Sequence, residues 1–159
     1  MKRAVVTGGT SGIGAGISSL LANEGWSVIA VSNSEQEIEA ISPQNGIKFC
    51  FLDVTDQNSV DELFCNLKSL DGLVNCAGIL LRNEEYEIEN FSRVIDVNLT
   101  GTMRCCLAAY PHLKKKKGGI VNMASMLSTF GGPLVPAYSA SKGGVAQLTK
   151  ALAGHWAKD

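Results

Sequence analysis

Short apolar runs recur along the chain, separated by polar or glycine-rich stretches. The runs centre on Val5, Ile29, Phe49, Leu73 and Val121. Each run is brief and almost wholly apolar, which is typical of parallel strands that are covered on both faces. The pattern therefore predicts five buried strands.

Helical periodicity fills the intervals between these runs. It predicts helices over residues 12–24, 35–41, 56–68, 88–115 and 138–157. Thr55 is a suitable N-cap for the third helix. Strands alternating with helices predict a doubly wound parallel sheet, that is, a three-layer α/β/α Rossmann fold. A chain of 159 residues has room for a single domain, residues 1–159.

The composition and charge of the chain argue against several kinds of binding partner and against a metal site. The net charge is −1 and 18% of residues are charged, so neither nucleic acid nor an anionic membrane is an expected partner. No apolar run is long enough to span a bilayer. The five cysteines lack CxxC spacing, so we expect no metal site and we place Cys105 and Cys106 in helix packing. An odd number of cysteines and no secretory signal at the N-terminus favour reduced thiols in the cytoplasm.

A glycine-rich turn follows the first predicted strand and opens the first predicted helix. Glycines allow positive φ angles and close approach of a pyrophosphate, and the helix N-terminus offers free N–H groups. A tight turn without a ligand is the alternative. We predict dinucleotide contacts from the residues of this turn: Gly8, Thr10, Ser11, Gly12, Ile13 and Gly14.

A second chemical motif lies near the other end of the chain. Tyr138 and Lys142 are four residues apart, so they share one face of a helix. The ammonium favours the phenolate, and the Ser125 hydroxyl could bond the oxygen that the tyrosine protonates. This equipment moves a proton on an alcohol or carbonyl oxygen, while the hydride has to come from a cofactor. An ordinary helix pair and a strand-end hydroxyl are the alternatives.

Asn98 interrupts an apolar stripe of the long helix predicted over 88–115. A polar side chain there costs free energy unless it finds partners. Asn98 is therefore either a structural core residue that bonds a backbone carbonyl or a functional residue.

Taken in order, these motifs resemble the short-chain dehydrogenase/reductase family over nearly the whole chain. Asp53-Val54 and Asn75-Cys76-Ala77-Gly78 add to the likeness, although Cys76 stands where the family often has asparagine. The resemblance implies an NAD(P)-dependent oxidoreductase that interconverts an alcohol and a carbonyl. It implies the following site residues: Tyr138 as general acid or base, Lys142 on the nicotinamide ribose, Ser125 on the substrate oxygen and Asn98 in a proton relay.

The resemblance also implies contacts to the adenosine half of the cofactor. Asp53 would bond the adenine amino group with Val54 beside it, unless it caps a helix, and Asn75, Ala77 and Gly78 would line the adenosine. An acid at the end of the second strand selects NAD. Ser32 and Asn33 occupy this region and neither is charged. The expected cofactor is therefore NAD or NADP, with a slight preference for NAD.

The resemblance carries three further expectations. The stretch from Ser125 to Tyr138 is similar to sugar-acid dehydrogenases acting on deoxygluconate, so the substrate would be a small alcohol or carbonyl compound. Family members form dimers or tetramers and continue beyond this point with further strands, so we expect a C-terminally truncated fold with an exposed fifth strand. A dinucleotide-binding module without turnover is the alternative function.

Overall fold

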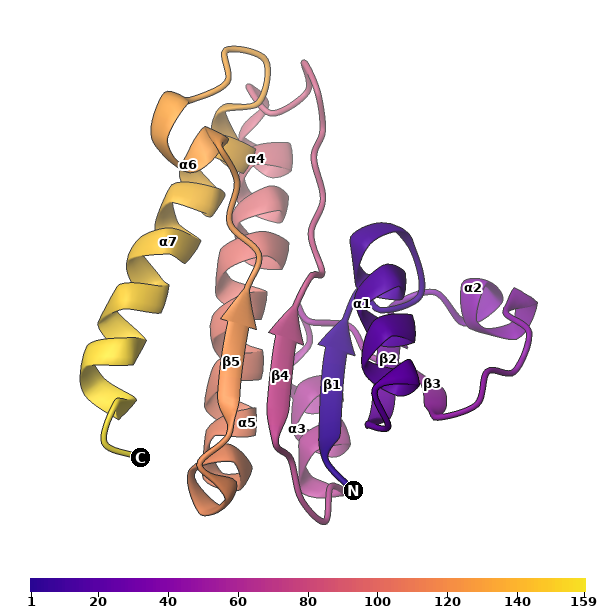
Figure 1. Ribbon diagram of the computed structural model, residues 1–159. Helices are drawn as coiled ribbons and strands as arrows, with labels where there is room; N and C mark the ends of the chain where they lie inside the picture. The colour runs from indigo at the N-terminus through magenta and orange to yellow at the C-terminus, as the bar shows by residue number, and fades with distance from the viewer.

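A computed structural model describes all of residues 1–159 (Figure 1). It confirms the predicted alternation of strands and helices, and each predicted strand centre falls inside a strand. The elements, in chain order, are β1 (Arg3–Thr7), α1 (Gly12–Asn23), β2 (Ser27–Ser32), α2 (Glu35–Ala40), β3 (Ile47–Phe51), α3 (Gln57–Cys65), β4 (Gly72–Asn75), α4 (Ile88–Ile95), the π-helix η1 (Asp96–Thr100), α5 (Gly101–Lys116), β5 (Gly119–Asn122), α6 (Leu127–Phe130) and α7 (Pro136–Trp156).

The strands form one parallel sheet with the order β3-β2-β1-β4-β5. The chain builds outward from β1 to β3 and then returns to add β4 on the opposite side of β1. This reversal confirms the doubly wound Rossmann fold. It also creates a crevice beyond the carboxyl ends of β1 and β4, where ligands bind in sheets of this kind. These ends carry the arrowheads in Figure 1.

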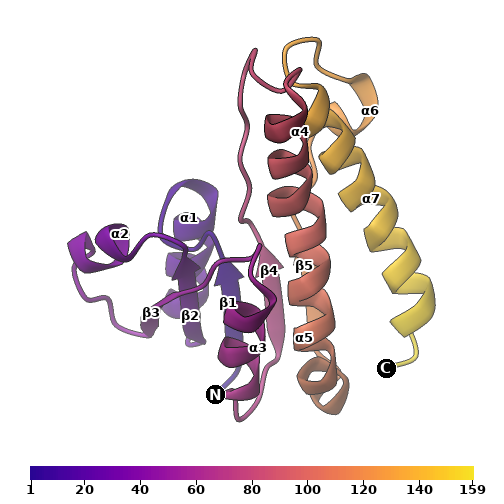
Figure 2. The same cartoon turned by 180° about the vertical axis from the view of Figure 1, so that it is seen from behind.

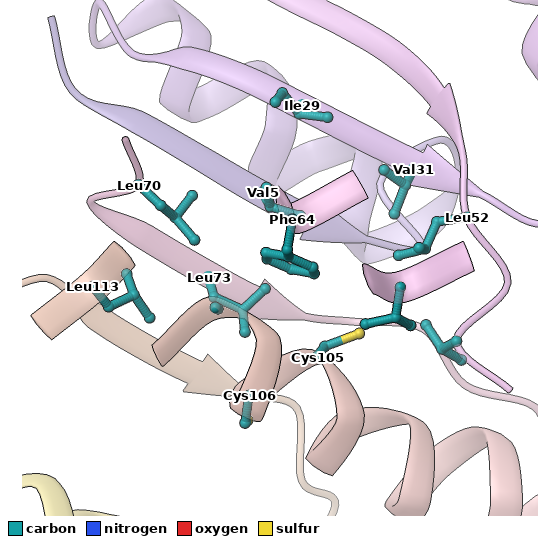
Figure 3. Packing of buried hydrophobic residues seen from close by; sticks show 13 residues of the cluster. Val5, Ile29, Val31, Leu52, Phe64, Leu70, Leu73, Cys105, Cys106 and Leu113 are labelled. Atoms are coloured by element: carbon teal, nitrogen blue, oxygen red, sulfur yellow. The ribbon is translucent and has the colours of Figure 1, made fainter. Parts of the chain in front are cut away.

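Alternation along the strands divides the apolar core between the two faces of the sheet. Val5 belongs to the larger cluster, in which α3 contributes Phe64 and α5 contributes Cys105 and Cys106 (Figure 3). Val6 points to the other face and packs with residues of α1. Both cysteines of α5 are fully buried, as predicted, and burial raises the pKa of the Cys105 thiol to about 12.

Helices cover the two faces unequally. Figure 2 shows α3 and α5 against one face, with α7 beyond β5. On the other face α1 lies over β1 and β2, and Figure 1 shows no helix in front of β4 and β5. Val121 of β5 is consequently 57% exposed. The structure thus confirms the expected exposed fifth strand. By length and hydropathy, every helix falls short of what a membrane crossing requires.

Two predicted helices differ in detail from the structure. Thr55 is not the N-cap of α3, because its hydroxyl donates to the Asp53 carboxylate at 2.7 Å; Asp56 takes this position and accepts from the Asn58 N–H. The helix predicted over 88–115 is interrupted by η1, whose backbone follows the wider π pattern. Sequence periodicity does not register one added residue within a long helix, and single-turn π segments are frequent at functional sites.

Candidate functional site

A cleft of about 710 Å³ opens at the carboxyl ends of the inner strands. Its walls come from the glycine-rich turn, the ends of β2 and β3, the segment after β4, and α4 with η1. The predicted contacts that line it are Gly8, Thr10, Ser11, Ser32, Asn33, Asp53, Val54, Ala77 and Gly78. Residues that are distant in sequence therefore converge on one cavity.

The glycine-rich turn leaves the N-terminus of α1 open toward a ligand. Gly12 has φ of +51°, and a Cβ added there would meet nothing within 4 Å. Gly14 serves packing instead, since its Cβ would lie 2.0 Å from the Gly8 carbonyl oxygen. Ser11 is the N-cap residue but makes no side-chain cap bond, and the first turn carries no acid. The free N–H groups and the positive dipole end suit a phosphate.

The far end of the cleft is formed by β2 and β3. Ser32 closes β2 and is buried, whereas Asn33 is exposed. Asp53 has one carboxylate oxygen committed to Thr55, which donates its N–H at 2.9 Å and its hydroxyl at 2.7 Å. Asp53 therefore closes a local turn and does not cap α3, whose N-cap is Asp56, and it lines the cleft. Its second carboxylate oxygen makes no hydrogen bond within the chain and could accept one from a ligand.

Glu37 of α2 also lines this end of the cleft, which the sequence pattern did not predict. Its Oε2 accepts a hydrogen bond from the Ser32 hydroxyl at 2.6 Å. A signal was present, because Ser34 and Glu37 have the Ser-x-x-Glu spacing of a helix start. That spacing marks the beginning of a helix, but it does not say toward which side the carboxylate turns.

The segment after β4 divides its roles between the cleft and the core. Ala77 and Gly78 line the cleft, and Thr7 holds this segment by accepting from the N–H groups of Cys76 and Ala77, both at 3.1 Å. Asn75 is buried instead. Its amide donates to Asn122 of β5 at 2.8 Å, while its Oδ1 has no hydrogen-bond partner within the chain.

Tyr138 and Lys142 lie one turn apart near the start of α7, as their spacing predicts. The Lys142 ammonium stands 5.6 Å from the centroid of the Tyr138 ring and donates to the Met123 carbonyl oxygen at 2.7 Å. Lys142 is 5% exposed and forms no salt bridge. Burial lowers the pKa of its ammonium below the usual range. The Tyr138 hydroxyl makes no hydrogen bond within the chain and remains available.

Gly78 connects this pair to the cleft. A Cβ at Gly78 would lie 3.7 Å from the Lys142 Nζ and 3.2 Å from the Asn98 Oδ1. Gly78 therefore lines the cleft and also lies close to the Lys142 ammonium and the Asn98 amide. Burial raises the pKa of the Cys76 thiol. The nearby Lys142 ammonium acts in the opposite direction, but its effect on this pKa is smaller.

Ser125 occupies the segment between β5 and α6. Its Oγ accepts from the Leu127 N–H at 3.2 Å, so its own proton is free to be donated. Beside it, Met126 and Phe130 are 73% and 77% exposed. These two side chains do not pack in the core, so they are available to a substrate.

Asn98 lies within η1 and is fully buried. Its amide spans two segments: Oδ1 accepts from the Ile79 N–H at 2.8 Å, and Nδ2 donates to the Ile79 carbonyl oxygen and to the Ser141 hydroxyl. Asn98 thus ties η1 to the loop after β4 and to the turn of α7 between Tyr138 and Lys142. The proton relay that the resemblance implies for Asn98 stays a prediction.

A second hollow of about 260 Å³ lies between α5, β5 and α7. Its lining is mostly apolar and includes Tyr110, Ile120 and Trp156, and the rings of Tyr110 and Trp156 stack with centroids 4.3 Å apart. None of the predicted site residues lines it. The chemistry of the chain is therefore concentrated at the carboxyl ends of the strands.

Comparison with known proteins agrees with this geometry. The sequence profile of the family described as short chain dehydrogenase matches residues 2–159. The chain is 42% identical to 2-dehydro-3-deoxy-D-gluconate 5-dehydrogenase of Bacillus subtilis, covering 98% of this chain and 65% of the relative. It is 35% identical to L-fucose dehydrogenase of Oryctolagus cuniculus, covering 96% of this chain and 56% of the relative.

Solved structures show the same likeness in three dimensions. The crystal structure of gox2181 superposes with a TM-score of 0.89 at 30% identity, covering 99% of this chain and 67% of the other. The chain spans less than two thirds of the length of the curated relatives named above.

Proposed function

Because the chain belongs to the short-chain dehydrogenase family, we propose that it is an NAD(P)-dependent oxidoreductase that interconverts an alcohol and a carbonyl. The observation that carries this proposal is the buried Lys142 ammonium held 5.6 Å from the Tyr138 ring centroid. An unpaired buried ammonium costs stability, so a role in chemistry accounts for its retention. Its only hydrogen bond within the chain goes to Met123, which leaves protons of the ammonium free for a ligand.

The residues of the cleft fit a dinucleotide. The open N-terminus of α1 would hold the pyrophosphate, the polar wall at Ser32 and Asp53 would hold the adenosine, and Gly78 leaves room toward Lys142. When bound, the nicotinamide would donate or accept the hydride. We assign Lys142 to the ribose hydroxyls beside the nicotinamide.

Proton transfer to the substrate oxygen is the task we assign to Tyr138. Its hydroxyl has no partner within the chain, and the Lys142 ammonium lies 5.6 Å from the centroid of its ring. Ser125 would donate its free proton to the same substrate oxygen and so polarise it. Asn98 positions these groups, because it bonds Ser141, which lies between Tyr138 and Lys142 in α7, and Ile79 in the loop after β4.

The substrate class we propose is a sugar acid. The support is the 42% identity to the Bacillus subtilis 2-dehydro-3-deoxy-D-gluconate 5-dehydrogenase. L-fucose dehydrogenase, also a relative, acts by its name on a neutral sugar. Keto sugar acids and neutral sugars therefore belong in the same assay panel, and their relative rates decide between them.

The test is turnover of NADH or NADPH with a panel of carbonyl compounds, followed by the absorbance of the reduced cofactor. Tyr138→Phe should lower turnover by about a hundredfold or more, because general acid–base catalysis contributes this much, while dinucleotide binding persists. Tyr110→Phe is the matched control, since Tyr110 lines the distant apolar hollow. Undiminished turnover of the Tyr138→Phe variant would contradict the assignment. Dinucleotide binding without turnover across the panel would favour the non-catalytic module.

A further inference from the structure

Glu37 directs a carboxylate into the cleft from a helix that is otherwise peripheral. The helix α2 has six residues, none of them buried, and begins at the N-cap Ser34. The Ser34 hydroxyl accepts from the Glu37 N–H at 3.2 Å, as in a capping box. The Glu37 side chain, however, does not complete that box.

A hydroxyl relay takes the place of the usual contact. In a capping box the glutamate returns to the N–H of the N-cap residue. Here the Ser34 N–H donates to the Ser32 Oγ at 3.2 Å, and the Ser32 hydroxyl donates its own proton to the Glu37 Oε2 at 2.6 Å. The carboxylate is thus held beside the end of β2, on the wall of the cleft.

The surroundings of this carboxylate keep it ionised. Hydrogen bonding from Ser32, and to a smaller extent from Thr10 and Ser11, lowers the pKa of the Glu37 carboxyl. Ser32 in turn has no proton left to donate, since Glu37 takes it. A ligand at this wall therefore meets an acceptor with a full negative charge.

We propose that Glu37 selects dinucleotides that carry a free adenosine 2′-hydroxyl, by accepting a hydrogen bond from it, and so makes the chain specific for NAD. The inference rests on the proposed function, because it assumes that the cleft binds a dinucleotide. A 2′-phosphate would face the carboxylate, and the repulsion between these like charges should weaken binding by at least about tenfold.

No cation on the same wall offsets this charge. Arg93 is the one cation among the residues that line the cleft, and it belongs to α4. The helices α2 and α4 lie well apart in both Figure 1 and Figure 2. The acid on this wall comes from α2 rather than from the end of β2, where the uncharged Ser32 and Asn33 stand.

The test compares ligands that differ only in the 2′-phosphate. Calorimetric titration of the 159-residue chain with NADH, NADPH, 5′-AMP and 2′,5′-ADP gives two matched affinity ratios. We expect the phosphorylated member of each pair to bind at least about tenfold more weakly. Glu37→Gln keeps the size of the side chain and an acceptor oxygen, and it should bring both ratios close to one. Glu35→Gln, an exposed glutamate at the start of α2, should leave them unchanged.

The outcomes separate this inference from the proposed function. NADH and NADPH binding equally well to the wild type, or an unchanged preference in Glu37→Gln, would overturn the role of Glu37 while leaving the oxidoreductase intact. If neither dinucleotide binds, the proposed function fails and the inference falls with it. Circular dichroism of the variants confirms that any change in the ratios arises in a folded chain.

Discussion

Lys142 shows how a single side chain can be placed for chemistry at the expense of stability. It is almost fully buried, no carboxylate pairs with it, and its one hydrogen bond within the chain goes to the Met123 carbonyl oxygen. A buried charge without a counter-charge is normally removed from a protein core. Its presence beside Tyr138 is explained if the ammonium acts on the phenol and on a bound ribose.

We expect Lys142→Met to raise the free energy of unfolding by on the order of 1 kcal/mol while it abolishes turnover. Methionine is similarly long and flexible and needs no solvation. The Met123 carbonyl would lose a donor, but Met123 is only half-buried, so water can replace it. Urea denaturation measures the first effect and cofactor oxidation the second. A variant that is less stable than the wild type would show that the ammonium stabilises the fold.

The lowered pKa of Lys142 also predicts how the stability difference between the wild type and Lys142→Met changes with pH. Between the lowered folded value and the ordinary value, the unfolded chain binds more protons than the folded chain. Stability therefore rises with pH in this interval. The advantage of Lys142→Met should accordingly shrink as the pH increases through the alkaline range.

At the scale of elements, two loops far apart in sequence are joined at the mouth of the site. The loop between β4 and α4 meets the segment between α6 and α7. The Asn83 N–H donates to the Leu134 carbonyl oxygen at 2.9 Å, and the Tyr86 hydroxyl donates to that of Pro133 at 2.7 Å. Glu85, which is 1% exposed, accepts from the Leu81 N–H and the Tyr138 N–H. Its carboxylate thus stabilises both the loop and the N-terminus of α7.

Removing this carboxylate should loosen the start of α7. We expect Glu85→Ala to lower the free energy of unfolding by about 2–3 kcal/mol, because two partly buried N–H groups would lose their carboxylate acceptor. Turnover should fall further than stability alone requires, since the second N–H belongs to Tyr138. Urea denaturation and kinetics give the two values, with the exposed Glu84→Ala as the reference. Equal stability of the two variants would contradict the role of Glu85.

Most strands and helices of the fold were predictable from the sequence. The strands centred on Val5 and Ile29 are fixed by apolar runs, and the start of α1 is fixed by its glycines, because these signals are local. The convergence of Ser32, Asp53 and Gly78 on one cleft followed from the order of a doubly wound sheet.

Other features could not be predicted because they depend on contacts across the fold. Asn75 was expected along the adenosine, yet its amide is directed at Asn122 on the neighbouring strand. Glu37 carries a helix-start signal in the sequence, while its orientation depends on a hydroxyl two residues before the cap. Spacing alone gives neither direction.

At the scale of the whole molecule, the sheet offers an open side. β5 pairs only with β4, so its other edge presents unpaired backbone groups, and Val121 of this strand is exposed. An apolar strand edge of this kind favours pairing with another chain. The 159-residue chain should therefore self-associate as its concentration rises.

Val121→Lys should reduce this association, because a lysine on an edge strand opposes edge-to-edge pairing. Sedimentation velocity over a range of concentrations measures the effect, and we expect a clear shift toward the monomer. Leu20→Lys makes the same change at an exposed position of α1, 61% accessible, and should not alter association. If both variants associate like the wild type, contacts away from β5 hold the copies together.

The π-helical segment η1 joins α4 to α5, and its length sets how these two helices are rotated relative to each other. Before it, α4 packs against α7; after it, α5 packs against α3 and β4. Each residue of a helix turns the following ones by about 100°. Shortening the chain by one residue between Asp96 and Thr100 would swing α4 around its axis relative to α5 and part Asn98 from Ser141. The number of residues in this stretch therefore sets how α4 and α5, and with them the two halves of the site, are aligned.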